Sequence, residues 1–457
     1  MNILLLTDSY KVTHYKQYPP NTEKVYSYFE SRGGVYPTVC FFGLQYFIKK
    51  YLEGKVVTKA KIDEAEAIFK DHFSNDDMFN RTGWEYILEK YEGRLPVRIK
   101  AAPEGTVMPY RNVLMTIENT DPNCYWLTNY LETLLVQVWY PTTVATQSYH
   151  LSKIIGKYLE QTGTPADMPF KLHDFGFRGV SSVESAGIGG AAHLVNFQGT
   201  DTLQALQTIR QYYNTNMVAG FAVPASEHST MTSWGRAHEA DAYRNMLEQY
   251  PTGIVSIVSD SYDIYNAAKE IYGKQLKELI LERDGNLVVR PDSGDITEVI
   301  FKLLDILGDA FGTSINDKGY KVLHPKVRIL QGDGMDAEAI EALLEVVTKA
   351  GWSADNLVFG MGGGLLQKVH RDTQKFAFKC SWAEINGEGR DVYKDPITDK
   401  GKKSKKGRMK LILDEKGNYK TVGENVVGND LLETVFENGV CLKEYSFEEI
   451  RTNGFSS

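Results

Sequence analysis

The sequence predicts an α/β protein built on a parallel sheet or barrel. Four short apolar runs, rich in β-branched residues and too short for helices, are typical of buried strands and cover residues 254–258, 287–289, 327–330 and 357–359. An acidic or glycine-rich turn follows each run, and helical patterns such as residues 296–307 lie between them. In such folds ligands bind at the carboxyl ends of the strands. We therefore expect acids, an arginine and bare backbone amides to meet on one rim, as the binding of a phosphorylated sugar with a divalent metal requires.

The first part of the chain, to about residue 145, mixes short strands with helical stretches. Periodicity predicts strands at residues 24–29, 97–101 and 113–117, and helices around 44–52 and 125–139. This mixture differs from the regular strand–helix alternation that follows it, and it indicates a separate α/β domain.

The alternation occupies the middle of the chain, from about residue 170 to about 379. After Cys380 the sequence changes to short strands and turns rich in Gly, Asp and Lys, with nothing long enough to form its own core. We expect this tail to pack on the N-terminal region. The predicted organisation is a discontinuous α/β domain, residues 1–145 plus 380–457, around an α/β barrel at 146–379.

The bulk composition is that of a soluble enzyme. The 457 residues include 51 basic and 59 acidic ones, and the resulting net charge of −8 argues against nucleic-acid or anionic-membrane binding. The four cysteines are far apart and form no CxxC pair, which predicts reduced thiols and a cytoplasmic protein. No segment approaches the roughly 18 to 20 apolar residues of a spanning helix, and the N-terminus lacks the pattern of a signal peptide.

Three aspartates, Asp260, Asp292 and Asp333, follow three of the predicted strands. Carboxylates at strand ends can hold Mg²⁺, accept ribose hydroxyls or stabilise positive charge that develops on a ribose ring. Helix capping is the ordinary role of an acid in such a turn. Three acids on one rim favour a binding site over capping alone.

His228 follows a proline and small residues in the segment 223–230, a pattern typical of a tight turn at a strand end. Its side chain can serve as a nucleophile or as an acid and base, because the ordinary pKa of histidine lies near neutrality. The alternative is a buried, hydrogen-bonded histidine. Ten residues later, His238 does not complete an HExxH motif, so a zinc site is not expected.

Two glycine-containing segments can bind flat rings and phosphate. The run Gly362–Gly364 lets backbone amides approach an anion at the start of a helix near Leu365, although such runs also form plain turns. Arg371 follows closely and can reach the same phosphate. In residues 172–179, Phe175 can stack on a flat ring and Arg178 can bind a phosphate, against the alternatives of core packing and a surface ion pair.

Taken together, these segments resemble the nicotinamide phosphoribosyltransferase family along essentially the whole chain. The resemblance begins at Thr7–Tyr15 and includes Glu118–Pro122, Lys171–Gly176, Gly360–Lys368 and Ser404–Arg408, and it ends at Tyr445–Phe447. Matches of that length and order are more specific than any single motif.

The resemblance implies a type II phosphoribosyltransferase fold, an irregular α/β barrel joined to a second, discontinuous α/β domain, in a homodimer with shared active sites. It implies that nicotinamide reacts with phosphoribosyl pyrophosphate to give nicotinamide mononucleotide and pyrophosphate, for NAD salvage. ATP hydrolysis is expected to be coupled through a phosphorylated His228. Mg²⁺ is expected mainly on the pyrophosphate rather than in a protein cage.

The family pattern also implies roles for individual residues. Phe175 matches one face of the nicotinamide sandwich, Tyr10 of the partner subunit matches the other, and Asp201 matches the carboxylate that accepts the amide N–H. Asp260 and Asp292 match groups around the active-site histidine and the metal. The remaining matches are Arg290 at the amide and ribose, the mononucleotide and phosphate contacts Arg178, Gly332, Asp333, Gly362, Gly363 and Arg371, and the nucleotide or polyphosphate lysines Lys379, Lys394 and Lys402.

The chain departs from the animal pattern at three places. It lacks an insertion after Arg32, which suggests a bacterial or phage member, and Ala222 and Ala377 stand where serines are common. Each lost hydrogen bond weakens binding by about 0.5–1.5 kcal/mol. The alternative function is that of a nicotinate phosphoribosyltransferase. Asp201 favours the amide over it, because a carboxylate repels the acid's own carboxylate. A nucleotide-binding module without catalysis would not require His228.

Overall fold

The computed structural model describes residues 1–398 and 403–455, which form two compact units. Unit 1 comprises Met1–Thr146, Thr208–Met217 and His370–Ser457, and unit 2 comprises Gln147–Gln207 and Val218–Val369. The predicted domain boundaries stay a prediction. The two compact units differ from them mainly at residues 208–217 and 370–379, which belong to unit 1.

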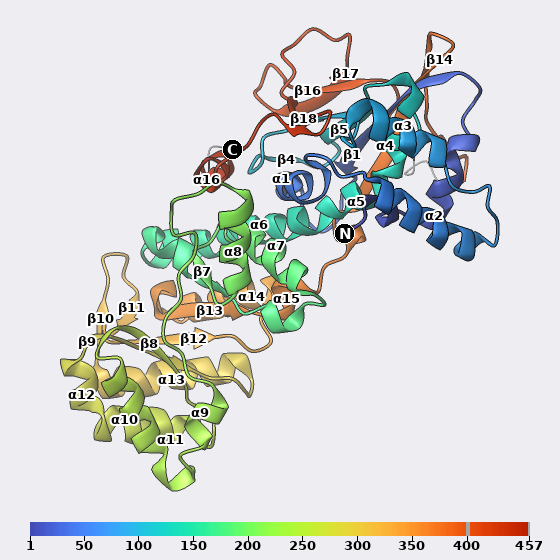
Figure 1. Cartoon of the computed structure of the whole chain (residues 1–457). Coiled ribbons are helices and arrows are strands. Elements are labelled where there is room, and N and C mark those ends of the chain that lie inside the picture. The colour runs from blue at the N-terminus through green and yellow to red at the C-terminus, as the bar shows by residue number, and fades with distance from the viewer. Residues whose placement is uncertain (399–402, 456–457) are drawn as a thin grey trace. The chain divides into compact units, whose positions relative to one another are not determined.

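Unit 2 is built on a six-stranded sheet whose strands are all parallel (Figure 1). The four predicted runs lie within four of these strands, so this part of the prediction is confirmed. In sheet order the strands are β7 (Gly199–Thr200), β6 (Leu172–Asp174), β13 (Leu357–Met361), β12 (Val327–Gln331), β9 (Asp284–Arg290) and β8 (Thr252–Val258).

The segment 221–225 joins the two edge strands of this sheet. Single bridges pair Phe221 with Gly199 of β7 and Ala225 with Ser256 of β8. The Ser256 N–H donates to the Pro224 carbonyl at 2.9 Å, and the Thr200 N–H donates to the Phe221 carbonyl at 3.0 Å. The sheet therefore curves into an irregular barrel, as predicted, and every strand has its carboxyl end on the same rim.

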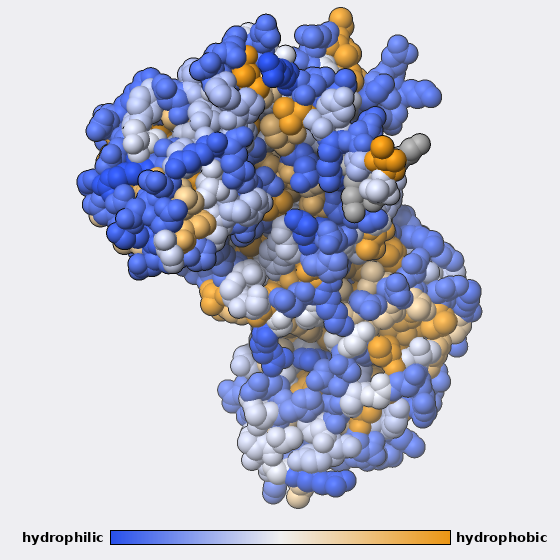
Figure 2. All heavy atoms as spheres, turned by 90° about the vertical axis from the view of Figure 1, so that its right-hand side faces the viewer, coloured by the Kyte–Doolittle hydropathy of each residue, from blue (hydrophilic) through white to orange (hydrophobic). Residues whose placement is uncertain are grey.

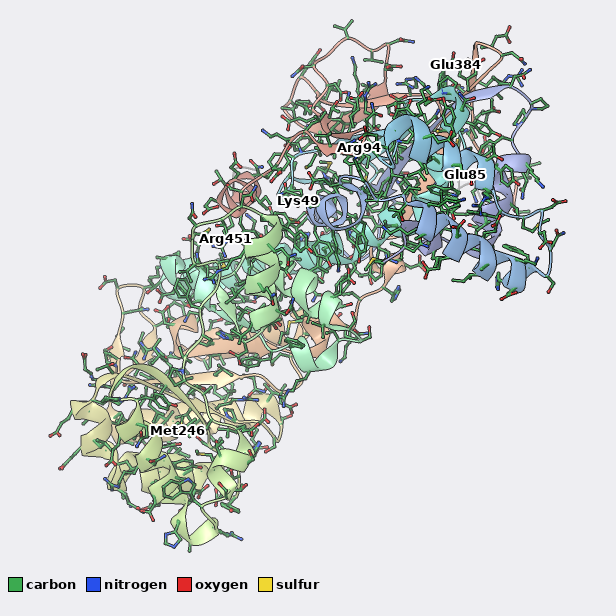
Figure 3. The ribbon with its side chains drawn as sticks, viewed as in Figure 1. Lys49, Glu85, Arg94, Met246, Glu384 and Arg451 are labelled. Carbon is green, nitrogen blue, oxygen red and sulfur yellow. The ribbon has the colours of Figure 1, made fainter. Side chains whose placement is uncertain are left out.

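Helices cover the sheet of unit 2. The predicted helix at 296–307 is α13, which buries five apolar side chains at helical spacing between Val299 and Leu307, and the Asp295 carboxylate caps it by accepting from the Glu298 N–H at 2.9 Å. Met246, labelled in Figure 3, is buried on α10. The helices are α7 (Val183–His193), α8 (Leu203–Tyr212, which runs into unit 1), α9 (His228–Thr232), α10 (Glu239–Gln249), α11 (Ile264–Asn266), α12 (Lys277–Glu282), α13 (Ile296–Phe311), α14 (Ala337–Lys349) and α15 (Gly363–Leu366). A two-stranded sheet joins β10 (Thr313–Ile315) to β11 (Lys321–Leu323).

Unit 1 is built on a seven-stranded antiparallel sheet. Strands from the tail flank strands from the start of the chain, since β14 pairs with β1 and β18 pairs with β3. The predicted return of the tail onto the N-terminal region is therefore observed. The strands, in sheet order, are β15 (Glu388–Asp391), β14 (Phe376–Ile385), β1 (Thr22–Ser31), β5 (Val113–Asn119), β3 (Val97–Ala101), β18 (Glu433–Glu437) and β19 (Val440–Cys441).

The helices of unit 1 are shorter than the periodicity predicted. The stretch around 44–52 is α1 (Leu44–Phe47) continued by a π-helical turn, and the stretch around 125–139 contains α4 (Leu127–Tyr130) and α5 (Glu132–Leu135) with 3₁₀ turns beside them. Helix α6 (Trp139–Thr162) begins in unit 1 and ends in unit 2. The other elements are α2 (Lys59–Phe73), α3 (Arg81–Tyr91), α16 (Phe447–Phe455), and the strand pairs β2 (Thr38–Cys40) with β4 (Val107–Pro109) and β16 (Met409–Leu413) with β17 (Tyr419–Gly423).

The surface is that of a protein with a polar exterior. Figure 2 shows a face on which hydrophilic residues predominate and hydrophobic ones are interspersed. Within the described residues, no helix combines the length and the apolar character that crossing a membrane requires. All four cysteines are free thiols.

Candidate active site

Unit 2 contains a cavity of about 420 Å³ that follows the inner face of its sheet. At the carboxyl ends of the strands it is lined by Phe175, Asp201 and Arg290, and Ala222 lines it farther along. Three of the predicted site residues therefore share one cavity, and the rim on which they lie is the one that the strand pattern predicted.

Phe175 owes its position to two glycines. Its N–H donates to the Met361 carbonyl at 2.9 Å, and its ring lies against the backbone of Gly332 and Gly360. A Cβ on Gly332 would stand 3.3 Å from the ring, and a Cβ on Gly360 would overlap it. The Arg290 guanidinium carbon is 5.3 Å from the ring centroid, within cation–π range. The Phe175 ring therefore requires a glycine at position 360. This role differs from the one that the sequence suggested for the next glycines, Gly362–Gly364, whose backbone amides were expected to approach an anion.

Asp201 lies beside a histidine that was not predicted as a site residue. The His173 Nε2 is 3.2 Å from the Asp201 Oδ1, and the His173 ring lines the same cavity against Gly199. The structure buries Leu172 and Asp174 of this strand, so the residue between them points to the opposite face; the alternation of side chains along a strand is the signal that could have placed it there.

Asp174 fixes the turn that carries Phe175. Its Oδ1 accepts from the Gly176 N–H at 2.7 Å, and its Oδ2 accepts from the Thr200 hydroxyl at 3.3 Å. Burial raises the pKa of this carboxyl, and the hydrogen bonds oppose that rise. The Asp174 carbonyl also accepts from the Asp201 N–H at 3.0 Å, so one residue positions both Phe175 and Asp201.

His228, Asp260 and Asp292 form a second group on the rim. The His228 Nε2 is 2.9 Å from the Asp260 Oδ1, and its Nδ1 is 4.0 Å from the Asp292 Oδ2. Asp292 also accepts from Arg290 at 2.8 Å, which links this group to the cavity. The Ser293 hydroxyl, which was not predicted, donates to Asp260. The His228 side chain is 46% exposed, so a substrate can reach it.

The glycine run meets the turn that carries Arg178. A Cβ on Gly179 would stand 3.1 Å from the Gly363 Cα, whereas a Cβ on Gly363 would meet no atom within 4 Å. The run thus lies open beside Arg178, which is exposed. The helix expected near Leu365 is the single turn α15, which begins at Gly363 and follows Gly362. Asp333 is exposed at the end of β12, on the same edge.

Unit 1 contains its own cavity, of about 680 Å³. Four predicted site residues line it: Tyr10, Arg371, Lys379 and Lys394. Burial lowers the pKa of Lys379; the Glu132 carboxylate opposes this, and the nearby cations Arg32, Lys394 and Arg371 lower it further. Arg371 belongs to unit 1 and the glycine run to unit 2, so their action on one phosphate stays a prediction. Lys402 lies outside the described residues.

Among the described residues, the carboxylates of the rim do not form a self-contained metal site. Within the described ranges no group of three or more His, Cys, Asp or Glu side chains is arranged to hold an ion. The rim offers Asp260 and Asp292, which are oxygen donors of the type that Mg²⁺ prefers. These donors fit an ion held mainly by a substrate and only in part by the protein.

Two family models match the chain. Residues 170–440 match the nicotinate phosphoribosyltransferase (NAPRTase) family, and residues 2–99 match the nicotinamide phosphoribosyltransferase N-terminal domain. The two matches cover most of the chain, and the first includes the whole rim described above.

Curated proteins match over nearly the full length. The nicotinamide phosphoribosyltransferase of Xanthomonas campestris is 52% identical over 99% of this chain and 98% of its own length. That of Acinetobacter baylyi is 35% identical over 99% of this chain and 96% of its own length.

Solved structures support the fold. A nicotinate-nucleotide pyrophosphorylase from Pyrococcus furiosus matches with a TM-score of 0.63 at 18% identity, over 99% of this chain and 95% of that one. Human nicotinic acid phosphoribosyltransferase matches with a TM-score of 0.57 at 16% identity, over 99% and 93%. At these identities the likeness concerns the fold alone, and it agrees with the predicted barrel and second domain.

Proposed function

The chain belongs to the nicotinamide phosphoribosyltransferase family, and from that premise we propose that it joins nicotinamide to phosphoribosyl pyrophosphate. The products are nicotinamide mononucleotide and pyrophosphate, a step of NAD salvage. The observation that carries the proposal is the cavity of unit 2, where Phe175 and Asp201 line the space and Arg290 connects it to His228, Asp260 and Asp292.

The cavity suits a flat aromatic amide. The Phe175 ring supplies a stacking surface that the backbone of Gly332 and Gly360 holds in one orientation. The Asp201 carboxylate, at the same cavity, accepts an amide N–H. The acid analogue would bring a second carboxylate against Asp201, and this repulsion favours nicotinamide.

The chemistry exchanges one bond at the ribose for another. The lone pair of the pyridine nitrogen forms a bond to C1 of the ribose as the bond from C1 to the pyrophosphate oxygen breaks, and no proton is transferred. The ribose ring gains positive charge on the way, and the Asp292 carboxylate stabilises it. Bound Mg²⁺ would neutralise charge on the pyrophosphate that departs, with Asp260 and Asp292 as its protein donors.

ATP hydrolysis is coupled, in this proposal, through His228. With the Nε2–H donated to Asp260 at 2.9 Å, the lone pair stays on Nδ1. Nδ1 then attacks the γ-phosphorus of ATP, the bond to the ADP oxygen breaks, and water later hydrolyses the phosphohistidine. The exposure of His228 supports access of the nucleotide.

We further propose that the protein acts as a cytoplasmic homodimer in which Tyr10 of the partner subunit covers the second face of the base. Tyr10 supports this role because it is 58% exposed at the edge of a cavity that also contains Arg371, Lys379 and Lys394. An exposed aromatic ring next to cations suits a site completed by another copy. Four free thiols agree with a reducing compartment.

Nicotinate phosphoribosyltransferase is the second candidate, because the model that matches residues 170–440 carries that name. Turnover with either base, phosphoribosyl pyrophosphate and Mg²⁺, with and without ATP, decides between them. We expect a higher kcat/KM for nicotinamide than for nicotinate and stimulation by ATP. A preference for nicotinate would select the second candidate, and no product with either base would refute both.

A further inference from the structure

Three basic residues lie at the same end of three neighbouring strands in the unit 1 sheet. Arg32 follows the end of β1, Arg111 precedes β5 and Lys375 precedes β14. Strand β1 pairs antiparallel with both β14 and β5, and Ser31 pairs with Phe376, so the three turns lie at the same end of these strands. All three side chains line the 680 Å³ cavity.

Two of these basic residues have a left-handed backbone conformation, which normally favours glycine. Arg111 has φ = +67° and Lys375 has φ = +48°. Eight residues other than glycine show such values among those described, four of them asparagines, and the only basic ones are these two, which line the same cavity. Backbone strain of this kind concentrates at functional sites.

The end of β1 holds both strained turns. The Arg111 N–H donates to the Ser31 carbonyl at 2.7 Å, and the Arg32 N–H donates to the Lys375 carbonyl at 3.2 Å. Both turns are therefore tied to one strand end, which fixes the backbone positions from which the two side chains extend. A backbone that is already held in place needs no ordering when the side chains bind an anion.

The cavity has an excess of positive charge. Seven basic and three acidic side chains line it, in a protein whose net charge is −8. Arg32 is 3.4 Å from Glu30, and Lys11 is 2.8 Å from Glu132. Arg111 and Lys375 have no carboxylate partner within the described residues. Two basic residues in strained turns, without a carboxylate partner, indicate a binding site for a polyanion.

We propose that Arg111 and Lys375 bind a linear oligophosphate in this cavity, in addition to the lysines assigned above. The inference rests on the proposed function, which supplies two such groups: the pyrophosphate of phosphoribosyl pyrophosphate and the triphosphate of ATP. The guanidinium of Arg111 can hold two phosphate oxygens at once, and Lys375 supplies a point charge.

The test uses glycine, because it removes each charge and also relieves the strain of its turn. The variants are Arg111→Gly, Lys375→Gly and the double variant, with Arg111→Lys to retain the charge. The control is Ser74→Gly, an exposed residue at φ = +51° outside the cavity. Calorimetric titration with inorganic tripolyphosphate, at low and at high salt, measures affinity without turnover.

We expect the unliganded glycine variants to unfold at the same temperature as the wild type or higher. Their affinity for tripolyphosphate should fall about three- to tenfold per variant at low salt and less at high salt. Ser74→Gly should bind as the wild type does, and Arg111→Lys should bind more tightly than Arg111→Gly. Unchanged affinity in the double variant would overturn the proposal.

Steady-state kinetics then separate the two sources of oligophosphate. A higher KM for phosphoribosyl pyrophosphate assigns the cations to its pyrophosphate, and a higher ATP concentration for half-maximal stimulation assigns them to ATP; either supports the site. Failure of the proposed function is distinguishable, because the wild type would then form no mononucleotide while the tripolyphosphate titration still tests Arg111 and Lys375.

Discussion

The cavities of the two units differ in what lines them. The unit 2 cavity presents three phenylalanine rings (Phe170, Phe175 and Phe221), apolar strand residues, and polar groups of both charges. The unit 1 cavity is dominated by cations, of which Arg111 and Lys375 have no carboxylate partner within the described residues. A flat amide is recognised by stacking and one or two hydrogen bonds, whereas an oligophosphate is recognised by charge.

This difference separates the effects that substitutions should have. Changes to residues that line the unit 2 cavity should alter which base is used, with little dependence on salt. Changes in unit 1 should alter phosphate affinity and its salt dependence, because exposed charges are screened. The predictions below sharpen this division or break it, from the largest expected effect to the smallest.

The largest effect is expected for His228→Ala, which removes the proposed acceptor of the phosphoryl group. Incorporation of label from γ-labelled ATP and the stimulation by ATP should both disappear, while turnover without ATP persists. His238→Ala is the matched control, since His238 is also exposed and pairs with a carboxylate, Asp241, at 2.8 Å. A labelled phosphohistidine in the His228→Ala variant would assign the phosphoryl group to another residue.

Asp201→Ala should change the choice of base. The lost hydrogen bond to a charged group corresponds to about 1.5–3 kcal/mol, or roughly 10- to 150-fold in kcat/KM for nicotinamide. Use of nicotinate should be retained or gained, because the repulsive carboxylate is gone. Competition assays with both bases measure the ratio, and an unchanged ratio would remove Asp201 from base recognition.

Gly360→Ala should displace the Phe175 ring. The added methyl group would occupy the space of that ring, and overpacking of this kind destabilises by about 1–3 kcal/mol. We expect KM for nicotinamide to rise about fivefold or more, with tripolyphosphate affinity unchanged. The control Gly423→Ala adds a methyl group that meets no atom within 4 Å. Equal effects on both ligands would break the division between the cavities.

The smallest effect on catalysis is expected for Glu104, a buried acid in the scaffold of unit 1. Its carboxylate accepts from the Gly43 N–H at 2.9 Å, the Gln45 N–H at 2.5 Å and the Tyr213 hydroxyl at 3.2 Å. Burial raises its pKa to about 7, above the ordinary value of 4.5. The folded state holds the Glu104 proton more tightly than the unfolded state does. Its contribution to the stability of the fold is therefore full below pH 4.5, and it is lost as the pH rises toward 7.

Thermal unfolding between about pH 4 and 8 measures this contribution. In Glu104→Gln the loss of stability over that range should be smaller than in the wild type, and kcat/KM for nicotinamide should be unchanged. Parallel pH profiles for the two proteins would show that Glu104 does not titrate in this range.

The sequence predicted the fold of unit 2 more closely than that of unit 1. Buried parallel strands are continuous apolar runs, so β8, β9, β12 and β13 could be recognised one at a time. In unit 1 the neighbours of β1 are β5 and β14, and β14 lies more than 340 residues farther along the chain than β1. No local pattern encodes such a pairing.

The same distinction applies to the site residues. Asp260 and Asp292 could be grouped because turns after parallel strands share a rim, and the resemblance to the family added His228 to them. The contact of His173 with Asp201, and the requirement of the Phe175 ring for Gly360, depend on side-chain packing between strands, which periodicity does not describe. Arg111 and Lys375 were missed because their left-handed conformations arise from hydrogen bonds to the distant end of β1.

The central proposal is that each active site is shared between two subunits, with Tyr10 supplied by the partner subunit. Mixed dimers test it most directly: one chain carries Asp292→Ala, and the other carries Tyr10→Ala with Arg371→Ala. If sites are shared, each mixed dimer has one intact site, and an equal mixture should recover about a quarter of wild-type turnover. Turnover no higher than the average of the two inactive homodimers, with mixed dimers demonstrably formed, would contradict the account.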